Sequence, residues 1–507
     1  LQGMRACPGR VTTGRQCDGV AGRQHVPGNP LRLGFLAIRR GSTTGDIDWG
    51  NGQSETRGRQ PPPRCTRQPA RQPAGSRFAA ESGGSFRRGR RCPTVAACGA
   101  DMKPETRPLI LHVIHHLATG GLENGLVNLI NHLPENRFRH AIACVEDFSD
   151  FRFRLTRSDT PVFALNRSRV GVWRLRHGLF RLCRQLQPTI VHSRNQSGLD
   201  ALLPARLAGV PHCIHGEHGW DVDDLAGRRI KPALLRRLHA PLIDRYITVS
   251  AELRNYLVHR IGISSRRITQ IINGVDTVRY APATQAGERW QSLPAGFAVP
   301  GSVLIGTVGR LQAVKDQATL LRAFASVVRD GDAAASRARL VIVGDGPLRE
   351  SLRSLAAELG VSSLTWFPGA VSNVGEVLQA LDLFVLPSLA EGISNTLLEA
   401  MATGLPLLAT ATGGNVELVA DGLSGRLFQP RDVARLGDLL RQYLADPRLR
   451  QRHGSAAREI AVAHFSLATM LADYQSVYEE FCDRRQQAPV TLASRRPNCG
   501  AGPADGS

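Results

Sequence analysis

The feature that most constrains the fold is an alternation of short, continuously apolar runs with helical segments, which begins at Pro108. The first run spans 109–114, a glycine turn follows at 119–121, and a helical pattern covers 122–133. Runs that are apolar throughout are typical of parallel strands whose two faces are both covered by helices. The sequence therefore predicts an α/β fold of the doubly wound type.

The alternation occurs twice along the chain. The first cycle predicts further strands at 140–145, 161–164, 190–192, 211–217, 245–249 and 268–272. After a looser stretch at 281–300, the second cycle predicts strands at 302–309, 340–343, 364–367, 383–386, 407–409 and 425–428. Its predicted helices are 317–329, 347–359, 374–380, 395–401 and 433–444. Ligands of such folds bind at the carboxyl ends of the strands, so two tandem domains predict a cleft between them.

The resulting domain plan is two Rossmann-like domains at 107–285 and 286–466, a C-terminal helix at 467–485, and terminal segments at 1–106 and 486–507. Residues 1–100 hold 17 Arg, no Lys and five acidic residues, and so more than half of the formal charge of +21. Because this segment is rich in Gly, Pro and Gln, we expect residues 1–106 and 486–507 to be disordered. For the first segment we expect an over-extended gene model, with translation starting at Met102.

A basic arm for nucleic acid or for an anionic membrane is the alternative interpretation of the first segment. It lacks the aromatic residues and the amphipathic period that would favour either, and we expect no nucleic-acid partner. The ten cysteines form no CxxC pair, which argues against a metal site or a disulfide framework. With no apolar run long enough to span a bilayer and no signal-peptide pattern, we expect a cytoplasmic protein, soluble or peripheral at the inner face of the membrane.

The most informative segment surrounds Glu391, in a loop just past the predicted strand 383–386. Ser394 is a good N-cap for the helix that starts at Asn395, and Gly392 lets the backbone pass close to a ligand. The free N–H groups of that helix offer a site for a diphosphate. Glu399 lies about one and a half turns into the helix. Two carboxylates beside a diphosphate are tolerable when they bind hydroxyl groups, so we expect Glu391 and Glu399 to bind sugar hydroxyls.

Arg310 and Lys315 form a second constellation, directly after the first strand of the second domain. Lys315 is one of only three lysines in a chain that otherwise uses arginine. Two fixed cations at this edge of the sheet can stabilise the charge that develops on a departing nucleoside diphosphate.

These motifs resemble those of glycosyltransferase family 4. Glu391 and Glu399 reproduce its E-x7-E signature, and 309–315 resembles its G-R-L-x-x-x-K donor-phosphate motif. Segments 343–348 and 273–276 match two more landmarks, and the likeness, which covers about 107–484, is strongest to sugar transferases of bacterial exopolysaccharide loci. The resemblance implies a GT-B fold, a nucleoside-diphosphate-sugar donor, retention of anomeric configuration, and neither a cofactor nor a metal.

The resemblance also implies roles for single residues. Arg310 and Lys315 would bind the diphosphate, Glu391 the transferred sugar and Glu399 the ribose, with Ser394 and Asn395 at the helix N-terminus. In the first domain, Gly120 and Gly121 resemble a glycine loop that approaches donor and acceptor. His218 resembles a histidine that faces the transferred sugar, although His215 stands close by and fits a packing role better. Residues 192–195 are candidates for the acceptor pocket.

The predicted function is a retaining, metal-independent hexosyl transfer to a glycan or lipid-linked acceptor in polysaccharide biosynthesis. The acidic pair Asp221 and Asp223 has a D-x-D form, but nothing else indicates a metal site there. Segment 227–238 mixes basic and apolar residues, which suits contact with an anionic membrane or an ordinary surface helix. A nucleotide-sugar epimerase, a phosphorylase and a non-catalytic sugar-nucleotide-binding scaffold stay open as alternatives.

Overall fold

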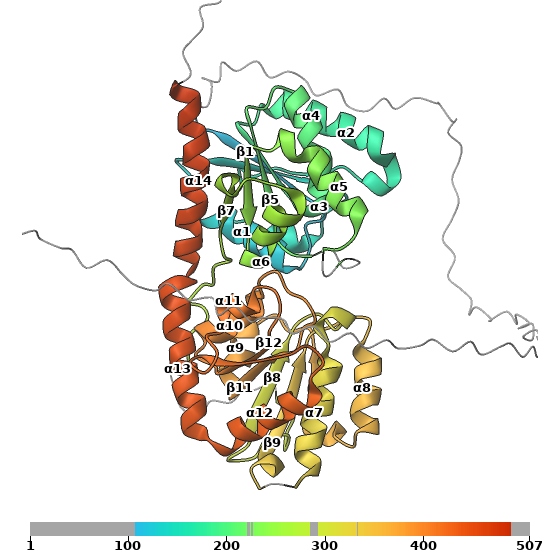
Figure 1. Cartoon of the computed structure of the whole chain (residues 1–507), viewed down its shortest axis with the longest axis vertical. Coiled ribbons are helices and arrows are strands. Elements are labelled where there is room, and N and C mark those ends of the chain that lie inside the picture. The colour runs from blue at the N-terminus through green and yellow to red at the C-terminus, as the bar shows by residue number, and fades with distance from the viewer. Residues whose placement is uncertain (1–106, 221–223, 225–226, 284–292, 332, 488–507) are drawn as a thin grey trace, which may run out of the picture. The chain divides into compact units, whose positions relative to one another are not determined.

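The computed structural model describes residues 107–220, 224, 227–283, 293–331 and 333–487 (Figure 1). All of them belong to one compact unit of the chain. No helix within these ranges is both long enough and apolar enough to cross a membrane.

The first domain is built on a seven-stranded parallel sheet with the order β3-β2-β1-β4-β5-β6-β7. Its strands are β1 (Leu109–Ile114), β2 (Arg139–Cys144), β3 (Val162–Ala164), β4 (Ile190–Arg194), β5 (His212–Glu217), β6 (Arg245–Thr248) and β7 (Ile268–Gln270). Every residue of β1 is buried, as expected for a strand at the centre of a sheet that is covered on both faces.

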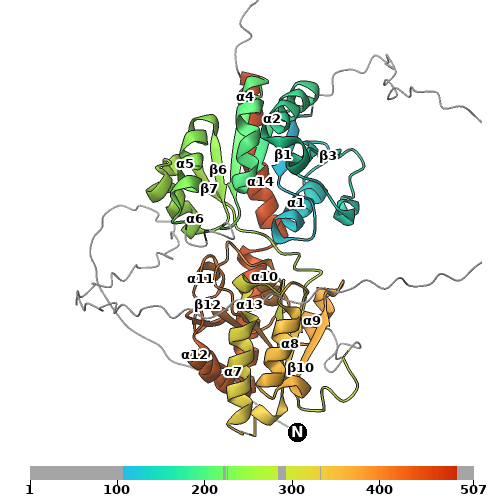
Figure 2. The same ribbon diagram turned by 90° about the vertical axis from the view of Figure 1, so that its right-hand side faces the viewer.

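The helices of this domain follow the strands in alternation. They are α1 (Gly121–His132), α2 (Arg167–Leu186), α3 (Asn195–Gly198), α4 (Leu202–Leu207), α5 (Ile230–His239) and α6 (Ala251–Asn255), the last continued by a π-helical turn at Tyr256–Ile261. Short 3₁₀ turns lie at Asp150–Arg154, Leu199–Ala201, Ala240–Leu242 and Ser265–Arg267. Helices α2 and α4 pack against each other, as the side view shows (Figure 2).

The second domain repeats this plan with six parallel strands in the order β10-β9-β8-β11-β12-β13. The strands are β8 (Val303–Val308), β9 (Ala338–Val343), β10 (Thr365–Gly369), β11 (Leu383–Leu386), β12 (Leu407–Thr410) and β13 (Gly425–Phe428). The helices are α7 (Gln317–Arg329), α8 (Arg349–Glu358), α9 (Val374–Ala380), α10 (Asn395–Ala402), α11 (Asn415–Leu418) and α12 (Val433–Ala445). Short 3₁₀ turns lie at Ala313–Lys315, Ala335–Arg337 and Ser362–Leu364.

Two long helices complete the chain. Helix α13 (Pro447–His464) contacts α10 and α12 of the second domain. Helix α14 (Leu467–Gln487) instead runs alongside the first sheet (Figure 1). Its apolar face, formed by Met470, Tyr474, Val477, Tyr478 and Phe481, joins a core cluster with Ile110, Ile190, Ile214 and Ile247 from four strands of that sheet.

The predicted fold class is confirmed: both sheets are parallel, and each of the thirteen strands lies where an apolar run predicts one. Helix α13 was not predicted. Its start was recognisable in the sequence, because Asp446 caps it by accepting from the backbone N–H of Leu449 and Pro447 occupies its first turn. Helix α14 continues to Gln487, two residues beyond its predicted end. The domain boundaries stay predictions, and the segments 1–106 and 488–507 lie outside the described residues.

Candidate functional site

The predicted site residues lie close to the point in each sheet where the strand order reverses. In the first sheet the order reverses between β1 and β4, and in the second between β8 and β11. The glycine turn 120–121 lies between β1 and α1, whereas Arg310 and Glu391 follow β8 and β11. Open parallel sheets bind their ligands at such switch points, beyond the carboxyl ends of the strands.

The glycine turn of the first domain meets the N-terminus of helix α10. The side-chain amide of Asn395 donates from Nδ2 to the backbone oxygen of Gly121 at 3.1 Å and accepts at Oδ1 from Nδ2 of Asn273 at 2.8 Å. A Cβ atom on Gly121 would stand 3.3 Å from Asn395 Nδ2. One amide thus joins two first-domain backbone turns to the start of α10.

Ser394 caps helix α10, as the sequence predicts. Its hydroxyl accepts a hydrogen bond from the backbone N–H of Leu397 at 3.3 Å. The preceding Gly392 passes so close to the first domain that a Cβ atom there would lie 2.5 Å from the backbone oxygen of His218. The predicted sugar-binding loop and the predicted histidine are therefore in backbone contact.

The loop that carries Glu391 is braced from behind by a second pair of glycines. A Cβ atom on Gly413, whose φ is +54°, would lie 1.8 Å from the Glu391 backbone oxygen. Gly414 donates from its backbone N–H to the oxygen of Gly392 at 3.0 Å. The two consecutive glycines after β12 could have indicated this close approach from the sequence, but they were not predicted to support the site.

Two of the predicted ligand-binding residues are paired with each other. Lys315 Nζ lies 2.6 Å from Glu391 Oε1, and both side chains are largely shielded from solvent. Arg310, in contrast, is exposed. This site therefore presents the exposed guanidinium of Arg310 and a lysine whose charge a carboxylate already balances.

The motif at 343–348 supports the loop that carries Arg310. Gly344 has a φ of +134°, and a Cβ atom on it would stand 1.9 Å from the backbone oxygen of Gly309. Two backbone hydrogen bonds tie Leu311 to this motif, one to the Asp345 oxygen at 2.9 Å and one from the Leu348 N–H at 3.1 Å. Since any side chain at Gly344 would displace the loop, this motif has a structural role behind the binding surface.

Glu399 is half-buried on helix α10 and bonds the Tyr280 hydroxyl. Burial raises the pKa of Glu399 to about 7, and the Tyr280 bond and the charges of Arg279 and Arg154 oppose this shift. Tyr280 was not predicted as a site residue, because it lies in the connection between the domains and belongs to no recognisable motif.

His218 and His215 have different surroundings. His215 is fully buried, bonding Ser193 Oγ at 2.8 Å and Glu217 at 3.4 Å, as the predicted packing role requires. All three side chains of this serine–histidine–glutamate chain are at least 98% buried, and none of them lines the pocket that His218 lines. His218 lines a small pocket with Gly121 and Asn273, and its Nε2 is buried without a hydrogen-bond partner in the structure.

The backbone N–H of His218 donates to Asn195 Oδ1 at 2.8 Å, and Asn195 itself has a positive φ of 51°. Burial, with the charge of Arg194, lowers the pKa of the His218 imidazole to about 3. His218 is therefore neutral at physiological pH and can act as a hydrogen-bonding group rather than as a cation.

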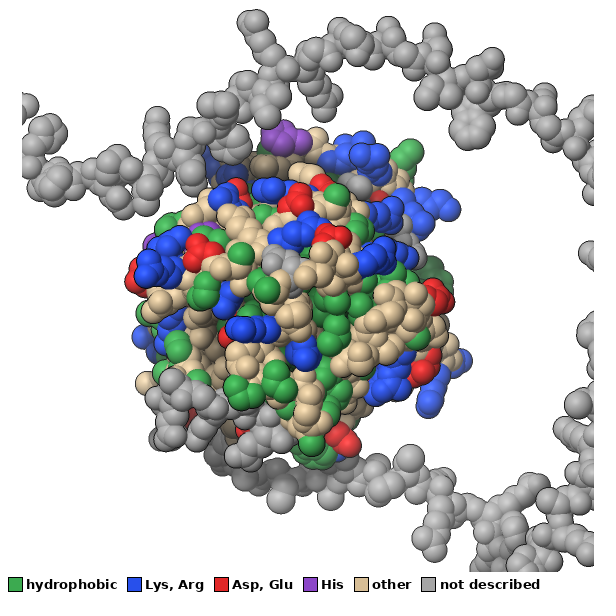
Figure 3. All heavy atoms as spheres, turned by 90° about the horizontal axis from the view of Figure 1, so that it is seen from below, with side chains coloured by type: hydrophobic (Ala, Val, Ile, Leu, Met, Phe, Trp, Pro, Cys, Tyr) green, Lys and Arg blue, Asp and Glu red, His purple; other side chains and the backbone are tan. Residues whose placement is uncertain are grey.

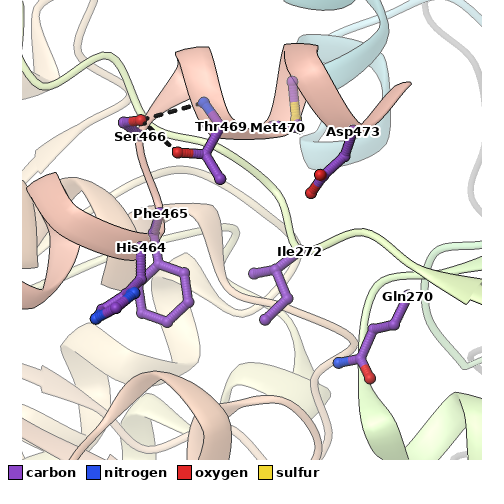
Figure 4. A pocket seen from close by; sticks show the side chains of 8 residues that line it. All are labelled: Gln270, Ile272, His464, Phe465, Ser466, Thr469, Met470 and Asp473. Carbon is purple, nitrogen blue, oxygen red and sulfur yellow. Dashed lines mark hydrogen bonds between the residues drawn. The ribbon is translucent and has the colours of Figure 1, made fainter. Parts of the chain in front are cut away.

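A larger cavity lies elsewhere, where the chain passes between β7 and α14 (Figure 4). Ser466 and Thr469 bond each other there, and the other lining residues are Gln270, Ile272, His464, Phe465, Met470 and Asp473. None of the predicted site residues lines it. Next to it, Val275 and Ser466 form an isolated parallel β-bridge. The cavity therefore borders the two segments of the chain that connect the domains.

Within the described ranges, no three His, Cys, Asp or Glu side chains gather so that they could hold a metal ion. The D-x-D segment 221–223 lies outside those ranges, and metal independence stays a prediction. None of the four described cysteines forms a disulfide. Burial raises the pKa of the thiols of Cys144, Cys183 and Cys213 to about 12, so they are unreactive.

Two family models match the chain. Residues 119–279 match the model described as Glycosyltransferase Family 4, and residues 290–460 match that of Glycosyl transferases group 1. The two matches fall on the first and the second sheet, respectively.

Two curated relatives match much of the chain. The UDP-Gal:alpha-D-GlcNAc-diphosphoundecaprenol alpha-1,3-galactosyltransferase of Escherichia coli is 28% identical over 308 residues, 59% of this chain and 79% of the relative. The D-inositol 3-phosphate glycosyltransferase of Frankia alni is 34% identical over 283 residues, 53% of this chain and 68% of the relative. Among solved structures, Anabaena HepE in complex with UDP has a TM-score of 0.63 at 19% identity and covers 74% of this chain and 100% of its own.

Proposed function

We propose a donor, an acceptor and a stereochemical course for this chain, which belongs to glycosyltransferase family 4 and is a glycosyltransferase. The donor is a nucleoside-diphosphate sugar, and the acceptor is a lipid-linked saccharide of bacterial polysaccharide biosynthesis. The observation that carries the proposal is the junction at Asn395, where a capped helix N-terminus, the Lys315–Glu391 pair and the glycine turn converge. The relatives are transferases, so the epimerase, phosphorylase and scaffold alternatives gain no support.

The diphosphate lies at the N-terminus of α10, where free N–H groups and the helix dipole favour an anion. Arg310 is free to bind it. Lys315 is held by Glu391 when no donor is present. As the phosphate arrives, Lys315 exchanges its carboxylate partner for a phosphate oxygen, and Glu391 is released to accept hydrogen bonds from sugar hydroxyls. Donor binding therefore couples the two residues.

Transfer retains the anomeric configuration and proceeds without a metal. The bond between the sugar C1 and the β-phosphate oxygen breaks, and the acceptor oxygen forms its bond to C1 from the same face. The acceptor proton passes to the departing phosphate, whose charge Arg310, Lys315 and the α10 N-terminus stabilise. The neutral His218, in backbone contact with Gly392, hydrogen-bonds the transferred sugar.

The acceptor assignment draws on the Escherichia coli relative, whose name specifies a diphosphoundecaprenol-linked sugar. Helix α5 suits such a membrane-bound substrate. Ile230, Leu234 and Leu238 recur every four residues and are 75%, 62% and 72% exposed, so they form one apolar stripe. Exposed Lys231 and Arg237 flank the stripe. Opposite them, the buried face of the helix packs on the domain.

A stripe of this kind can enter the lipid interface while its cations meet anionic headgroups. On the face that Figure 3 shows, basic side chains are interspersed with acidic and hydrophobic ones. We therefore place the protein in the cytoplasm with α5 on the inner face of the membrane.

Vesicle sedimentation tests the membrane contact. The full chain should bind vesicles containing phosphatidylglycerol, and binding should weaken with added salt. Replacing Ile230, Leu234 and Leu238 by Ser removes about 1.5–3 kcal/mol per fully inserted side chain, so binding should fall at least about tenfold. Val462→Ser, at an exposed apolar position of α13 that is outside the stripe, is the control. Equal binding by the triple variant and the control contradicts the membrane contact.

Nucleotide binding and product analysis test the reaction. Calorimetry of the full chain against UDP, GDP, ADP and their sugar conjugates should show one preferred nucleotide, with affinity unchanged by EDTA. With that sugar nucleotide and a diphosphate-linked acceptor, NMR of the product should show the anomeric configuration of the donor. An inverted product refutes retention, loss of binding or turnover in EDTA refutes metal independence, and binding without turnover favours the scaffold.

A further inference from the structure

Arg194, at the carboxyl end of β4, is a charged side chain in the interior of the first domain. It is 2% exposed. Its guanidinium meets His112 Nδ1 at 3.0 Å and His192 Nδ1 at 3.4 Å, and it also bonds the Tyr478 hydroxyl. An arginine cannot lose its proton inside a protein, so this charge is permanent.

The charge of Arg194 has no carboxylate partner among the described residues. Glu217, the buried acid of the neighbouring strand, is bonded to Arg236 at 2.6 Å and 3.1 Å. Glu123, in the first turn of α1, folds back over Gly120 and bonds its own backbone. A buried cation without a counter-ion is strongly unfavourable unless an anion is supplied from outside.

The surroundings of Arg194 also favour an anion. Arg194 lines a pocket with Gly121, Leu126, His218, Asn273 and Tyr474, so the glycine turn and the first residues of α1 form one wall. The free N–H groups of a helix start attract negative charge. The Nε2 atoms of His192 and His218 are buried without partners and lie 3.2 Å and 2.6 Å from the Cβ position of Gly216. His218 lines the pocket, so its Nε2 can bond a ligand there.

We propose that Arg194 binds an anionic group of the acceptor, a phosphate or a carboxylate close to the hydroxyl that reacts. The inference rests on the proposed function and adds a residue from the first domain to its acceptor side. The donor phosphates have their own cations, Arg310 and Lys315, on the second domain. Arg194 lies on the first domain and lines a pocket with Gly121 and His218, and neither Arg310 nor Lys315 lines that pocket.

The structure offers a matched control in a second buried arginine. Arg157 is 4% exposed, but its guanidinium bonds the backbone oxygens of Ile130, Leu133 and Phe138 and pairs with Asp159. All of its bonds are internal to the fold. Arg157→Met should therefore lower the melting temperature of the full chain and leave anion binding unchanged. Arg194→Met should lower the melting temperature less, because it also removes an uncompensated charge.

The test uses inorganic phosphate as the probe, with calorimetry and thermal shift on the full chain. Arg310→Ala/Lys315→Ala removes the donor-side cations, and phosphate should still bind this variant. Adding Arg194→Met should weaken that binding by about ten- to hundredfold, as expected for hydrogen bonds to a charged group. If Arg194→Met does not fold, Arg194→Lys replaces it and should weaken binding about tenfold, because its ammonium lacks the planar fork.

Unchanged phosphate affinity in the Arg194 variant, or loss of all phosphate binding in the Arg310/Lys315 variant, overturns the proposal. In the wild type, phosphate also competes with the nucleoside diphosphate for Arg310 and Lys315, and Arg194→Met should leave this competition unchanged. Competition that Arg194→Met abolishes would assign the pocket to the donor and overturn the acceptor assignment. If no nucleotide binds at all, the proposed function is refuted. If nucleotide binds but phosphate binding does not depend on Arg194, only the role of Arg194 is refuted.

Discussion

The raised pKa of Glu399 makes nucleotide binding depend on pH in a direction that can be worked out. Without a ligand the carboxyl has a pKa of about 7, because burial disfavours its charged form. If Glu399 accepts hydrogen bonds from the ribose hydroxyls, the bound nucleotide favours the charged form. Affinity should therefore rise as the pH rises through 7, and binding should release protons.

The size of the effect follows from the two pKa values. If the ribose returns the pKa of Glu399 to its ordinary value of 4.5, affinity at pH 8 should exceed affinity at pH 5.5 by about 25-fold. Glu399→Gln, which has no proton to lose, should flatten this part of the curve. Without a nucleotide, the contribution of Glu399 to stability is fully present below pH 4.5 and is lost as the pH rises through 7, and the same variant should remove that loss.

Isothermal calorimetry between pH 5.5 and 8, in buffers with different ionisation enthalpies, measures both the affinity and the protons released. The phosphates of the nucleotide also titrate in this range, so the relevant quantity is the difference between wild type and Glu399→Gln. Glu358→Gln, at an exposed position on α8, is the matched control and should behave like the wild type.

Equal pH slopes in the wild type and in Glu399→Gln would refute the ribose contact. A slope of opposite sign would show that the ligand binds beside protonated Glu399. Tyr280→Phe adds an internal check, because the Tyr280 bond lowers the pKa of Glu399. Its loss should move the affinity curve to higher pH.

Three further predictions concern the loops around the site. Lys315→Ala should lower kcat by about 10²–10³ through loss of charge stabilisation on the departing phosphate, and normal turnover in steady-state assays would remove that role. Gly344→Ala should destabilise the fold strongly, since its Cβ would stand 1.9 Å from a backbone oxygen. Gly360 has a φ of +73° but open space around it, so Gly360→Ala should lower the free energy of unfolding by only about 1–2 kcal/mol. Equal melting temperatures for this pair would contradict the buttress role of the 343–348 motif. Gly274→Ala should lower the free energy of unfolding by about 1–3 kcal/mol, because its Cβ would lie 2.8 Å from the first residue of α14. An unchanged melting temperature would show that the backbone here can move away without loss of stability.

The order of elements was predictable because it depends on local patterns. Apolar runs of three to eight residues locate the strands, and Ser394 was recognisable as a cap from its position before an apolar helix. The donor-side residues were predictable for a related reason. Arg310 and Glu391 lie in the loops that follow β8 and β11, so the parallel sheet brings them to one edge.

Contacts between distant segments were not predictable from local patterns. The Lys315–Glu391 pair spans 76 positions, and the bond between His192 and Tyr478 spans 286. The sequence shows α14 as an amphipathic helix, but not which sheet it covers. Arg194 was noted only as part of a loop, because its lack of a counter-ion is a property of the folded interior.

The return of α14 to the first sheet has a consequence for biosynthesis. The first domain leaves the ribosome early, yet Met470, Tyr474 and Tyr478, which cover the side chains of Ile110 and Ile190, are translated only after the whole second domain. At about 5–20 residues per second, the apolar surface of the first sheet waits tens of seconds for its last helix. Until α14 is synthesised, this part of the first sheet lacks the helix that covers it in the folded protein.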